Sequence, residues 1–286
     1  MNNKYEFSYR EALVQARNIL KRMNTRQKLL NHENFFNFDI NKCISDCVGR
    51  CCINTPVMIN VYDVYNILTS ERGKELGYGD TTKLFDGKNA PLILFLDENE
   101  NMPSAMINLI QKGLNLDICP FAYASNKDTN ILSLFNYYHE TADKMLYRMP
   151  HLSCGIHEIK PTICRSSPLS RMLIAEDERS FEFFYINPPS SNCPAINTNK
   201  KWRLKDRRRR LKEYIKKWDL ERFYKNRDKI TEIFELLVEK PIPFRRKIAK
   251  KLFNFDKDNI DQGLDPVKNR PSYEELFRTI IELIKK

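Results

Sequence analysis

The sequence is poor in glycine, with only 8 glycines among 286 residues. Gly77 and Gly79 form a close pair, but no third glycine completes the G-x-G-x-x-G fingerprint of dinucleotide-binding folds. The phosphate-binding pattern G-x-x-x-x-G-K-[S/T] is also absent. Both common kinds of phosphate-cradling loop are therefore disfavoured, and with them a standard nucleotide-binding α/β fold.

The sequence also lacks a long apolar segment. No stretch approaches eighteen uncharged apolar residues, so we expect no membrane span. Residues 1–22 are polar and contain neither the apolar centre nor the cleavage site of a secretory signal. We therefore expect a cytoplasmic protein, in which clustered thiols are more often metal ligands or redox-active groups than disulfides. A chain of this length can also bury enough surface to fold without cross-links.

The cysteines are the most informative feature that the sequence does have. Four of the 8 form a C-x3-C-x3-C-C run within ten residues, and four follow singly. The run is Cys43, Cys47, Cys51 and Cys52, and the single cysteines are Cys119, Cys154, Cys164 and Cys193. Thiols crowded in this way indicate metal ligands, a redox relay or disulfides. An isolated cysteine can equally be a small buried apolar side chain.

The spacing of the cysteines narrows the kind of metal site. The two C-x2-C knuckles of a mononuclear zinc ribbon are absent, and so are the ferredoxin spacings C-x2-C-x2-C and C-x4-C-x2-C. The run C-x3-C-x3-C also differs by one residue of spacing from the C-x3-C-x2-C pattern of radical S-adenosylmethionine enzymes. Adjacent cysteines suit two centres or a polynuclear cluster better than one tetrahedral ion. We therefore expect an iron–sulfur cluster or zinc, with the cluster slightly favoured.

Several spaced elements resemble the YkgJ-like cysteine-cluster family, whose members are expected to chelate zinc or iron. The first cysteine run resembles the signature of that family, and Cys119-Pro120-Phe121 resembles its C-P-F element. The segment from Cys154 to Arg165 resembles its C-x-I-Y-x-x-R-P-x-x-C-R element. The resemblance covers about 43–194 and implies that all eight cysteines bind metal.

The chain departs from this family pattern at a few places. His157 stands where tyrosine is usual and Lys160 where arginine is usual. The long gap between the second and third elements makes 124–150 an expected insertion. His157 is either a ligand or a packed aromatic ring, and Arg165 either supports a ligating sulfur or is a surface cation. Flagellin lysine N-methylase is similar to the same family, so the resemblance also allows a cluster-dependent lysine methylase.

Hydrophobic periodicity predicts an α+β chain, mainly helical, with a few short strands around a cysteine-rich metal site. We expect an N-terminal helical arm over 1–40, a cysteine-cluster domain over 41–198 and a basic helical region over 199–286. The predicted helices cover 8–30, 130–148, 226–239, 243–254 and 272–285, and a further helix begins after Asn60, with Asp63 completing a capping box. The predicted strands are Pro91–Leu96, Ser180–Ile186 and a hairpin of Met106–Ile110 with Asp117–Tyr123, which would carry Cys119 on its second strand.

Positive charge predominates, with a net charge of +11 and a pI of about 9.2. Its densest part is the basic run 200–210, where eight cations accompany Asp206 alone. Helical spacing continues from Leu204 through Leu211 and Ile215 to Trp218. Clustered cations of this kind bind the phosphates of a nucleic acid or an acidic protein, but they also form ordinary solvated helix faces.

Overall fold

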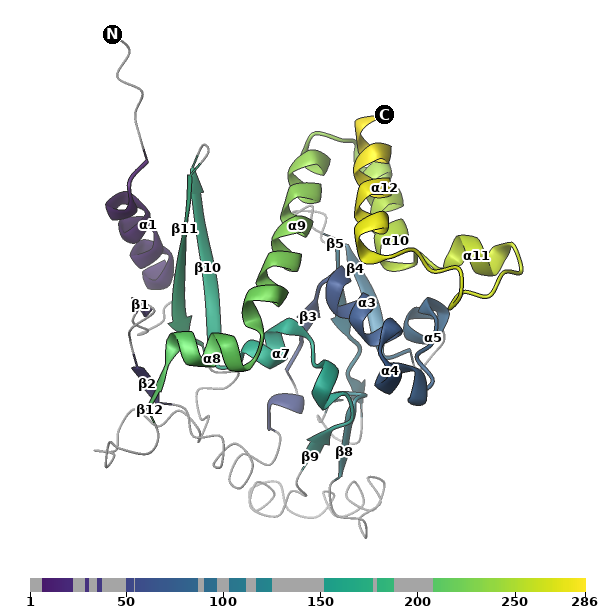
Figure 1. Ribbon diagram of the computed structural model, residues 1–286, viewed down its shortest axis with the longest axis horizontal. Helices are drawn as coiled ribbons and strands as arrows, with labels where there is room; N and C mark the ends of the chain where they lie inside the picture. Colours follow the sequence, from purple (N-terminus) through teal and green to yellow (C-terminus); the bar gives the residue numbers. More distant parts are fainter. Residues whose placement is uncertain are drawn as a thin grey trace. The chain divides into compact units, whose positions relative to one another are not determined.

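The computed structural model describes residues 7–22, 29–30, 35–37, 50–53, 55–86, 90–96, 103–111, 117–124, 152–176, 179–187 and 208–286. These residues form a mixture of helices and strands, so the predicted α+β class is confirmed (Figure 1). The domain boundaries predicted near 40 and 198, the helix predicted over 130–148 and the insertion predicted over 124–150 fall essentially outside the described residues. Within the described ranges, no helix combines the length and the apolar character needed to cross a membrane.

The chain divides into two compact units, each built from separate stretches of sequence. The first, here called the hairpin unit, consists of Met1–Cys47 and Ser166–Leu220. The second, here called the sheet unit, consists of Val48–Arg165 and Glu221–Lys286.

A long antiparallel hairpin organises the hairpin unit. Strand β10 (Leu169–Glu176) pairs with β11 (Arg179–Ile186), and β1 (Leu29–Leu30) adds to the other edge of β11. Helix α1 (Tyr9–Arg22) buries Ala12, Ala16 and Leu20, and its alanines pack in one cluster with Phe183 of β11. The strand predicted over Ser180–Ile186 is thus confirmed. The helix predicted over 8–30 is too long, because Leu30 pairs with Phe184 in the sheet.

Part of the basic run is extended. Strand β12 (Arg208–Arg210) pairs with β2 (Phe35–Asn37), and helix α8 (Leu211–Lys217) begins only after it. The helical spacing predicted through this part of the run is therefore wrong at Arg208–Arg210. Pairing with a distant strand outweighs a local helical pattern there. The remainder of the run, 200–207, lies outside the described residues.

The sheet unit packs helices around a small antiparallel sheet, in the order β3 (Met58–Ile59), β5 (Pro103–Ile107) and β4 (Leu92–Leu96). Helix α3 (Val61–Thr69) follows β3, and two short helices, α4 (Glu71–Glu75) and α5 (Thr81–Phe85), follow α3. The C-terminal helices are α9 (Leu220–Val238), α10 (Ile242–Phe253), α11 (Lys257–Asp261) and α12 (Tyr273–Lys285). The predicted strand Pro91–Leu96 and the predicted C-terminal helices are confirmed.

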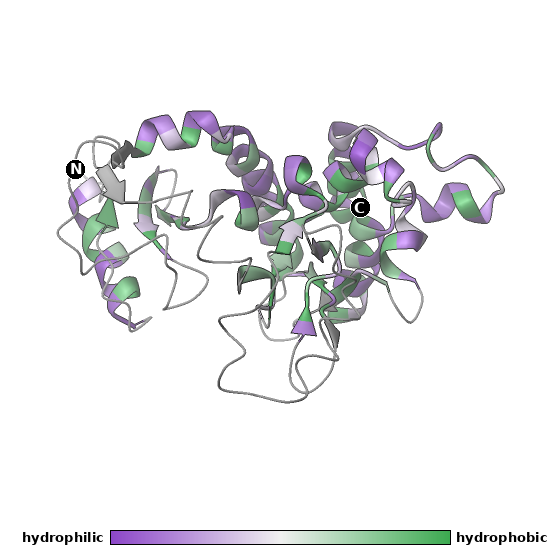
Figure 2. Ribbon diagram, turned by 90° about the horizontal axis from the view of Figure 1, so that it is seen from below, coloured by the Kyte–Doolittle hydropathy of each residue, from purple (hydrophilic) through white to green (hydrophobic). Residues whose placement is uncertain are grey.

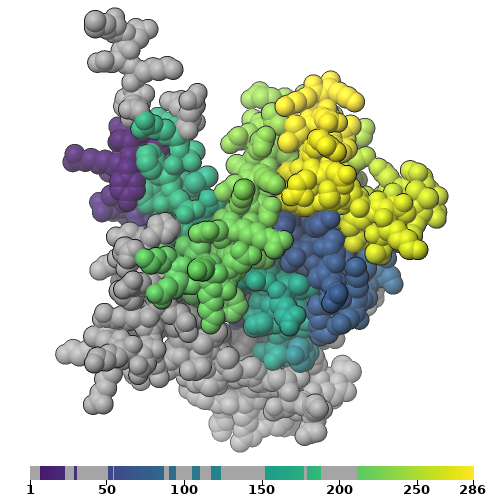
Figure 3. Space-filling model, in the orientation of Figure 1, coloured from purple at the N-terminus to yellow at the C-terminus, as the bar shows by residue number. Residues whose placement is uncertain are grey.

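Apolar side chains from the sheet and the helices form one core in the sheet unit. Tyr62 of α3 makes edge contacts with Phe223 of α9 and Tyr273 of α12. Helices α9 and α12 lie side by side (Figure 3). Green and purple residues alternate along helices such as α9, α10 and α12 because each of these turns one apolar face inward (Figure 2). A buried ion pair between Arg270 and Asp256 closes the end of this core, with Nη2 and Oδ2 2.6 Å apart.

Short elements connect this core to the cysteine segments. They are the 3-10 helix η1 (Arg50–Cys52), the ladder of β6 (Ile110–Gln111) with β7 (Asp117–Ile118), the ladder of β8 (Ala122–Ala124) with β9 (Leu152–Cys154), the 3-10 helix η3 (His157–Ile159) and helix α7 (Thr162–Ser166). The hairpin predicted between Met106–Ile110 and Asp117–Tyr123 is thus shorter than expected, because only β6 and β7 pair. Cys119 follows its second strand instead of lying on it.

Candidate metal centre

Five of the predicted metal ligands lie in the part of the sheet unit that the structure describes. They are Cys51, Cys52, Cys119, Cys154 and Cys164, and none of them is in a disulfide. They come from four separate segments: η1, the residue after β7, the end of β9, and α7. The other three predicted ligands, Cys43, Cys47 and Cys193, lie outside the described residues.

Backbone pairing joins the segments of Cys52 and Cys119. The N–H of Cys119 donates to the carbonyl of Cys52 at 2.8 Å, and the neighbouring residues Ile53 and Ile118 form an antiparallel bridge. The carbonyl of Cys119 then accepts from the N–H of Ala122 at 3.0 Å, which closes a turn after the cysteine. Two cysteines far apart in sequence are thereby held next to each other by main-chain bonds.

The same turn positions Cys154. Cys154 lies opposite Ala122 in the β8–β9 ladder, and the N–H of Gly155 donates to the carbonyl of Phe121 at 2.7 Å. A Cβ atom at Gly155 would lie 3.1 Å from that carbonyl oxygen, which is closer than ordinary contact. Only glycine therefore fits this close approach without displacing its neighbours.

A buried carboxylate anchors the helix that carries Cys164. Asp63 of α3 is 2% exposed, and its Oδ1 accepts from both the N–H and the hydroxyl of Thr162, the first residue of α7, at 2.7 Å each. Asp63 also completes the predicted capping box, since its Oδ2 accepts from the N–H of Asn60 and its own N–H donates to Oδ1 of Asn60. Burial raises the pKa of Asp63 to about 6, against the opposing effect of these hydrogen bonds and of Arg165.

Three of the five thiols, those of Cys51, Cys119 and Cys154, affect the ionisation of neighbouring cysteines. A hydrogen bond with Cys51, then burial, then negative charge at Cys51, Cys119 and Cys154 raise the pKa of Cys52 far above its ordinary value. Burial is the main cause that raises the pKa of Cys119 to about 11, and charge at Cys154 and Cys51 adds to it. Burial, followed by charge at Cys119, Cys51 and Cys154, also strongly raises the pKa of Cys164. The pKa values of Cys52, Cys119, Cys154 and Cys164 are all raised, so these four thiols stay protonated at neutral pH without a cation.

The described thiols do not by themselves form a complete metal-binding site. Among the described residues, no three cysteine, histidine, aspartate or glutamate side chains lie close enough together to hold one metal ion. The structure thus shows a neighbourhood of one exposed and four half-buried cysteines, whereas a metal centre built on it remains a prediction.

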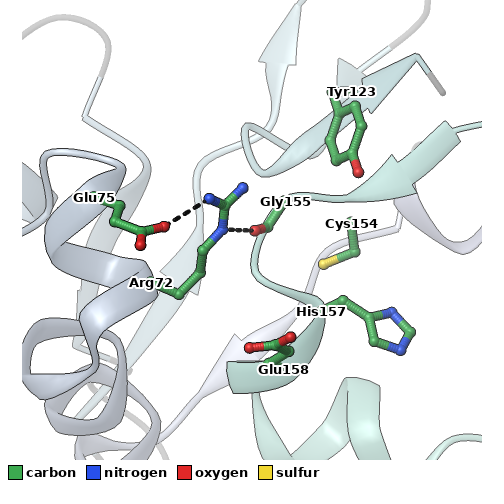
Figure 4. Close-up of a pocket in the computed structure, with 7 residues that line it drawn as sticks. All are labelled: Arg72, Glu75, Tyr123, Cys154, Gly155, His157 and Glu158. Carbon is green, nitrogen blue, oxygen red and sulfur yellow. Dashed lines mark hydrogen bonds and ion pairs between the residues drawn. The ribbon is translucent and has the colours of Figure 1, made fainter. Parts of the chain in front are cut away.

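A pocket of about 360 Å³ opens beside Cys154 (Figure 4). Its lining residues are Arg72, Glu75, Tyr123, Cys154, Gly155, His157 and Glu158. Arg72 spans it from α4, with Nε donating to the carbonyl of Gly155 at 3.0 Å and Nη1 2.9 Å from the Glu75 carboxylate. Sequence reasoning missed Arg72 and Glu75, because no spacing pattern relates α4 to the cysteines.

The structure describes both residues that the sequence offered as further parts of a metal site, His157 as a ligand and Arg165 as support for a ligating sulfur. His157 is largely exposed and lines the pocket, and its partial burial, followed by the charges of Lys160 and Arg165, lowers its pKa. The guanidinium of Arg165 donates to the carbonyl of Glu158 and lies 4.5 Å from the ring centroid of Phe223. Arg165 therefore braces the segment between Cys154 and Cys164. No protein-family model, curated protein or solved structure matches the chain, so the resemblance to the YkgJ-like cysteine-cluster family stays a prediction.

Proposed function

We propose that this protein is a metal-binding protein whose cysteines hold an iron–sulfur cluster, with zinc as the less favoured occupant. One observation carries the proposal: five thiols from four chain segments are gathered where the charges of Cys51, Cys119 and Cys154 raise the pKa values of neighbouring thiols. Ordinary core packing does not require such a gathering, because apolar side chains of similar size would fill the space without the mutual penalty.

The donor set fits a soft, polynuclear centre. Thiolates favour zinc and iron–sulfur clusters over hard cations such as magnesium or calcium. A structural zinc ion takes four ligands, whereas five described thiols are available and two of them, Cys51 and Cys52, are adjacent. A cluster with several metal ions accommodates two adjacent cysteines better than a single metal ion does. The participation of Cys43, Cys47 and Cys193 rests on the sequence alone.

Each residue near the thiols has a definable part in such a centre. The five described cysteines would supply thiolates, and the metal charge would offset the burial and the mutual repulsion that raise the pKa values of Cys52, Cys119 and Cys164. Asp63 would hold the helix of Cys164 in place, and Gly155 would allow β9 to approach the turn after Cys119. A bound iron–sulfur cluster would supply one-electron redox chemistry at this place.

Anaerobic purification followed by analysis of iron, zinc and acid-labile sulfide tests the proposal. We expect iron and sulfide in stoichiometric amounts with broad visible absorbance, and we expect Cys154→Ser to lose most of both. The neighbouring variant Ser153→Ala is the matched control and should keep its metal. A colourless, metal-free protein in which all eight cysteines react as free thiols would refute the proposal.

The pocket beside Cys154 favours a second candidate function. A metal centre that only stabilises the fold needs no cavity beside it. Here a pocket lined by Arg72, Tyr123 and Glu158 would let a small molecule reach the centre. A cluster-dependent protein-modifying enzyme, such as a lysine N-methylase, is the form that the sequence resemblance implies. Calorimetry of the metal-loaded protein with S-adenosylmethionine tests this form, and an absence of binding would contradict it.

A further inference from the structure

Cys52 and Cys119 lie opposite each other in antiparallel main-chain pairing. Ile53 and Ile118 form an antiparallel bridge, and the N–H of Cys119 donates to the carbonyl of Cys52 at 2.8 Å. In antiparallel pairing, the residue before Ile53 meets the residue after Ile118, so the register sets the two cysteines against each other. Opposite residues of this kind have their side chains on one face and their Cα atoms about 4.5–5.5 Å apart.

This register meets the main-chain requirement of a disulfide. A disulfide needs two Cα atoms roughly 4.4–6.8 Å apart and side chains that point toward the same space. Cys52 and Cys119 are both half-buried free thiols. The pKa of Cys52, raised first by a hydrogen bond with Cys51 and by burial, is raised further by charge at Cys51 and Cys119, so the two thiols also interact.

The other described cysteines are placed differently. Cys154 lies opposite an alanine in the β8–β9 ladder, and Cys164 belongs to the helix α7. Cys51 is the neighbour of Cys52 in η1, and a disulfide between adjacent residues strains the main chain. Among the described cysteines, Cys52 and Cys119 are therefore the pair that the main chain arranges for a disulfide.

We propose that Cys52 and Cys119 form a reversible disulfide when the site holds no metal, and that this disulfide withdraws both thiols from metal binding. The withdrawal rests on the proposed function, whereas the disulfide itself rests on the main-chain register. The two states exclude each other, because the thiolate is the metal ligand and a sulfur in a disulfide is no longer a thiolate. The chain would then take up metal in its reduced state, and oxidation of the empty site would prevent uptake until a thiol reductant acts.

A peroxide is the class of oxidant that fits half-buried thiols, because hydrogen peroxide is small. The thiolate of Cys119 attacks one peroxide oxygen, the O–O bond breaks, and hydroxide leaves while Cys119 becomes a sulfenic acid. The thiolate of Cys52 then attacks that sulfur, which forms the S–S bond and expels the second hydroxide. The two sulfur atoms together lose two electrons, and the two thiol protons convert the hydroxides to two molecules of water. A dithiol such as dithiothreitol reverses the step by thiol–disulfide exchange.

Oxidation of the full-length, metal-free chain tests the proposal. The chain is treated with a chelator and reductant, desalted and exposed to stoichiometric hydrogen peroxide. Its remaining thiols are then alkylated, and the protein is digested without reduction for mass spectrometry. We expect the loss of two of the eight thiols and a cross-linked peptide pair that joins Cys52 to Cys119. Dithiothreitol should restore all eight thiols, and a chain preloaded with zinc should resist the loss.

Single-cysteine variants identify the pair. Cys52→Ser and Cys119→Ser should each abolish the cross-link, whereas the matched control Cys164→Ser removes a neighbouring thiol and should keep it. Circular dichroism checks that each variant is folded before oxidation. Zinc uptake, followed with a metallochromic indicator, should be largely lost in the oxidised wild type and should return after treatment with dithiothreitol.

Three results would overturn the proposal. They are cross-links that join other cysteines in place of this pair, oxidation of thiols to sulfinic acid with no cross-link, and equal zinc uptake by the oxidised and the reduced chain. Failure of the proposed function looks different. If the reduced chain takes up neither zinc nor iron with sulfide while Cys52 and Cys119 still cross-link, the proposed function fails and the disulfide is supported.

Discussion

Asp63 and Thr162 are joined by two hydrogen bonds to one oxygen atom, since Oδ1 of Asp63 accepts from both the N–H and the hydroxyl of Thr162 at 2.7 Å. The contact connects α3, which follows the first cysteine segment, to α7, which carries Cys164. One buried carboxylate therefore couples local helix capping to the position of a candidate ligand.

Replacing this carboxylate tests its anchoring role. Asp63→Ala leaves the N–H and hydroxyl of Thr162 and the N–H of Asn60 without their acceptor, so we expect a loss of about 1–3 kcal/mol in the free energy of unfolding, together with reduced metal content. Urea unfolding and metal analysis measure the two effects. Asp80→Ala is the control: it removes the cap of α5, at a cost of about 1 kcal/mol, but should retain full metal content. Full metal content in Asp63→Ala would contradict the role.

The raised pKa of Asp63 predicts a pH dependence of stability in the metal-free protein. Its pKa rises from 3.8 to about 6 on folding, so the folded state holds the proton more tightly than the unfolded state. This contribution is present below about pH 4 and is lost as the pH rises through about 6. A two-unit shift corresponds to roughly 2–3 kcal/mol, and Asp63→Asn should abolish it. Urea unfolding of both proteins between these pH values measures the difference, and parallel curves would contradict the prediction.

The raised pKa values of the thiols predict that metal binding releases protons. Cys52, Cys119 and Cys164 are protonated at neutral pH, and each must lose its proton to become a ligand. We therefore expect more than one proton released per zinc ion bound, and an apparent affinity that increases from pH 6.5 to 8. Titration of the reduced apoprotein in weak buffer with a pH indicator measures the release. Metal uptake without proton release would show that the thiols are not the ligands.

Gly155 offers a test that leaves every thiol in place. In Gly155→Ala the new Cβ would lie 3.1 Å from the carbonyl oxygen of Phe121, which accepts the Gly155 N–H. We expect the β8–β9 ladder to shift, with a loss of about 1–3 kcal/mol from overpacking and lower metal occupancy. Gly79→Ala is the matched control, because its Cβ meets nothing within 4 Å. Thermal unfolding and metal analysis compare the variants, and equal behaviour would contradict the prediction.

Local patterns were the reliable part of the sequence analysis. The capping box of Asn60 and Asp63, the strands at Pro91–Leu96 and Ser180–Ile186 and the C-terminal helices are confirmed. Each shows in the sequence as a pattern among residues a few positions apart. The errors occurred where a distant partner decides the conformation: Leu30 pairs with Phe184, and Arg208–Arg210 pair with Phe35–Asn37. Those pairings outweigh the helical periodicity that the sequence shows at both places.

The amino-acid sequence by itself determined the helix caps, the amphipathic C-terminal helices and the supply of thiols, because these follow from side-chain type and short-range spacing. Only the tertiary structure decided which thiols become neighbours, that Asp63 reaches Thr162, and that Arg72 and Glu75 form a pocket wall beside Cys154. The physical reason is that main-chain pairing and core burial bring together segments that no local rule relates. The described thiols Cys51, Cys52, Cys119, Cys154 and Cys164 became neighbours in this way.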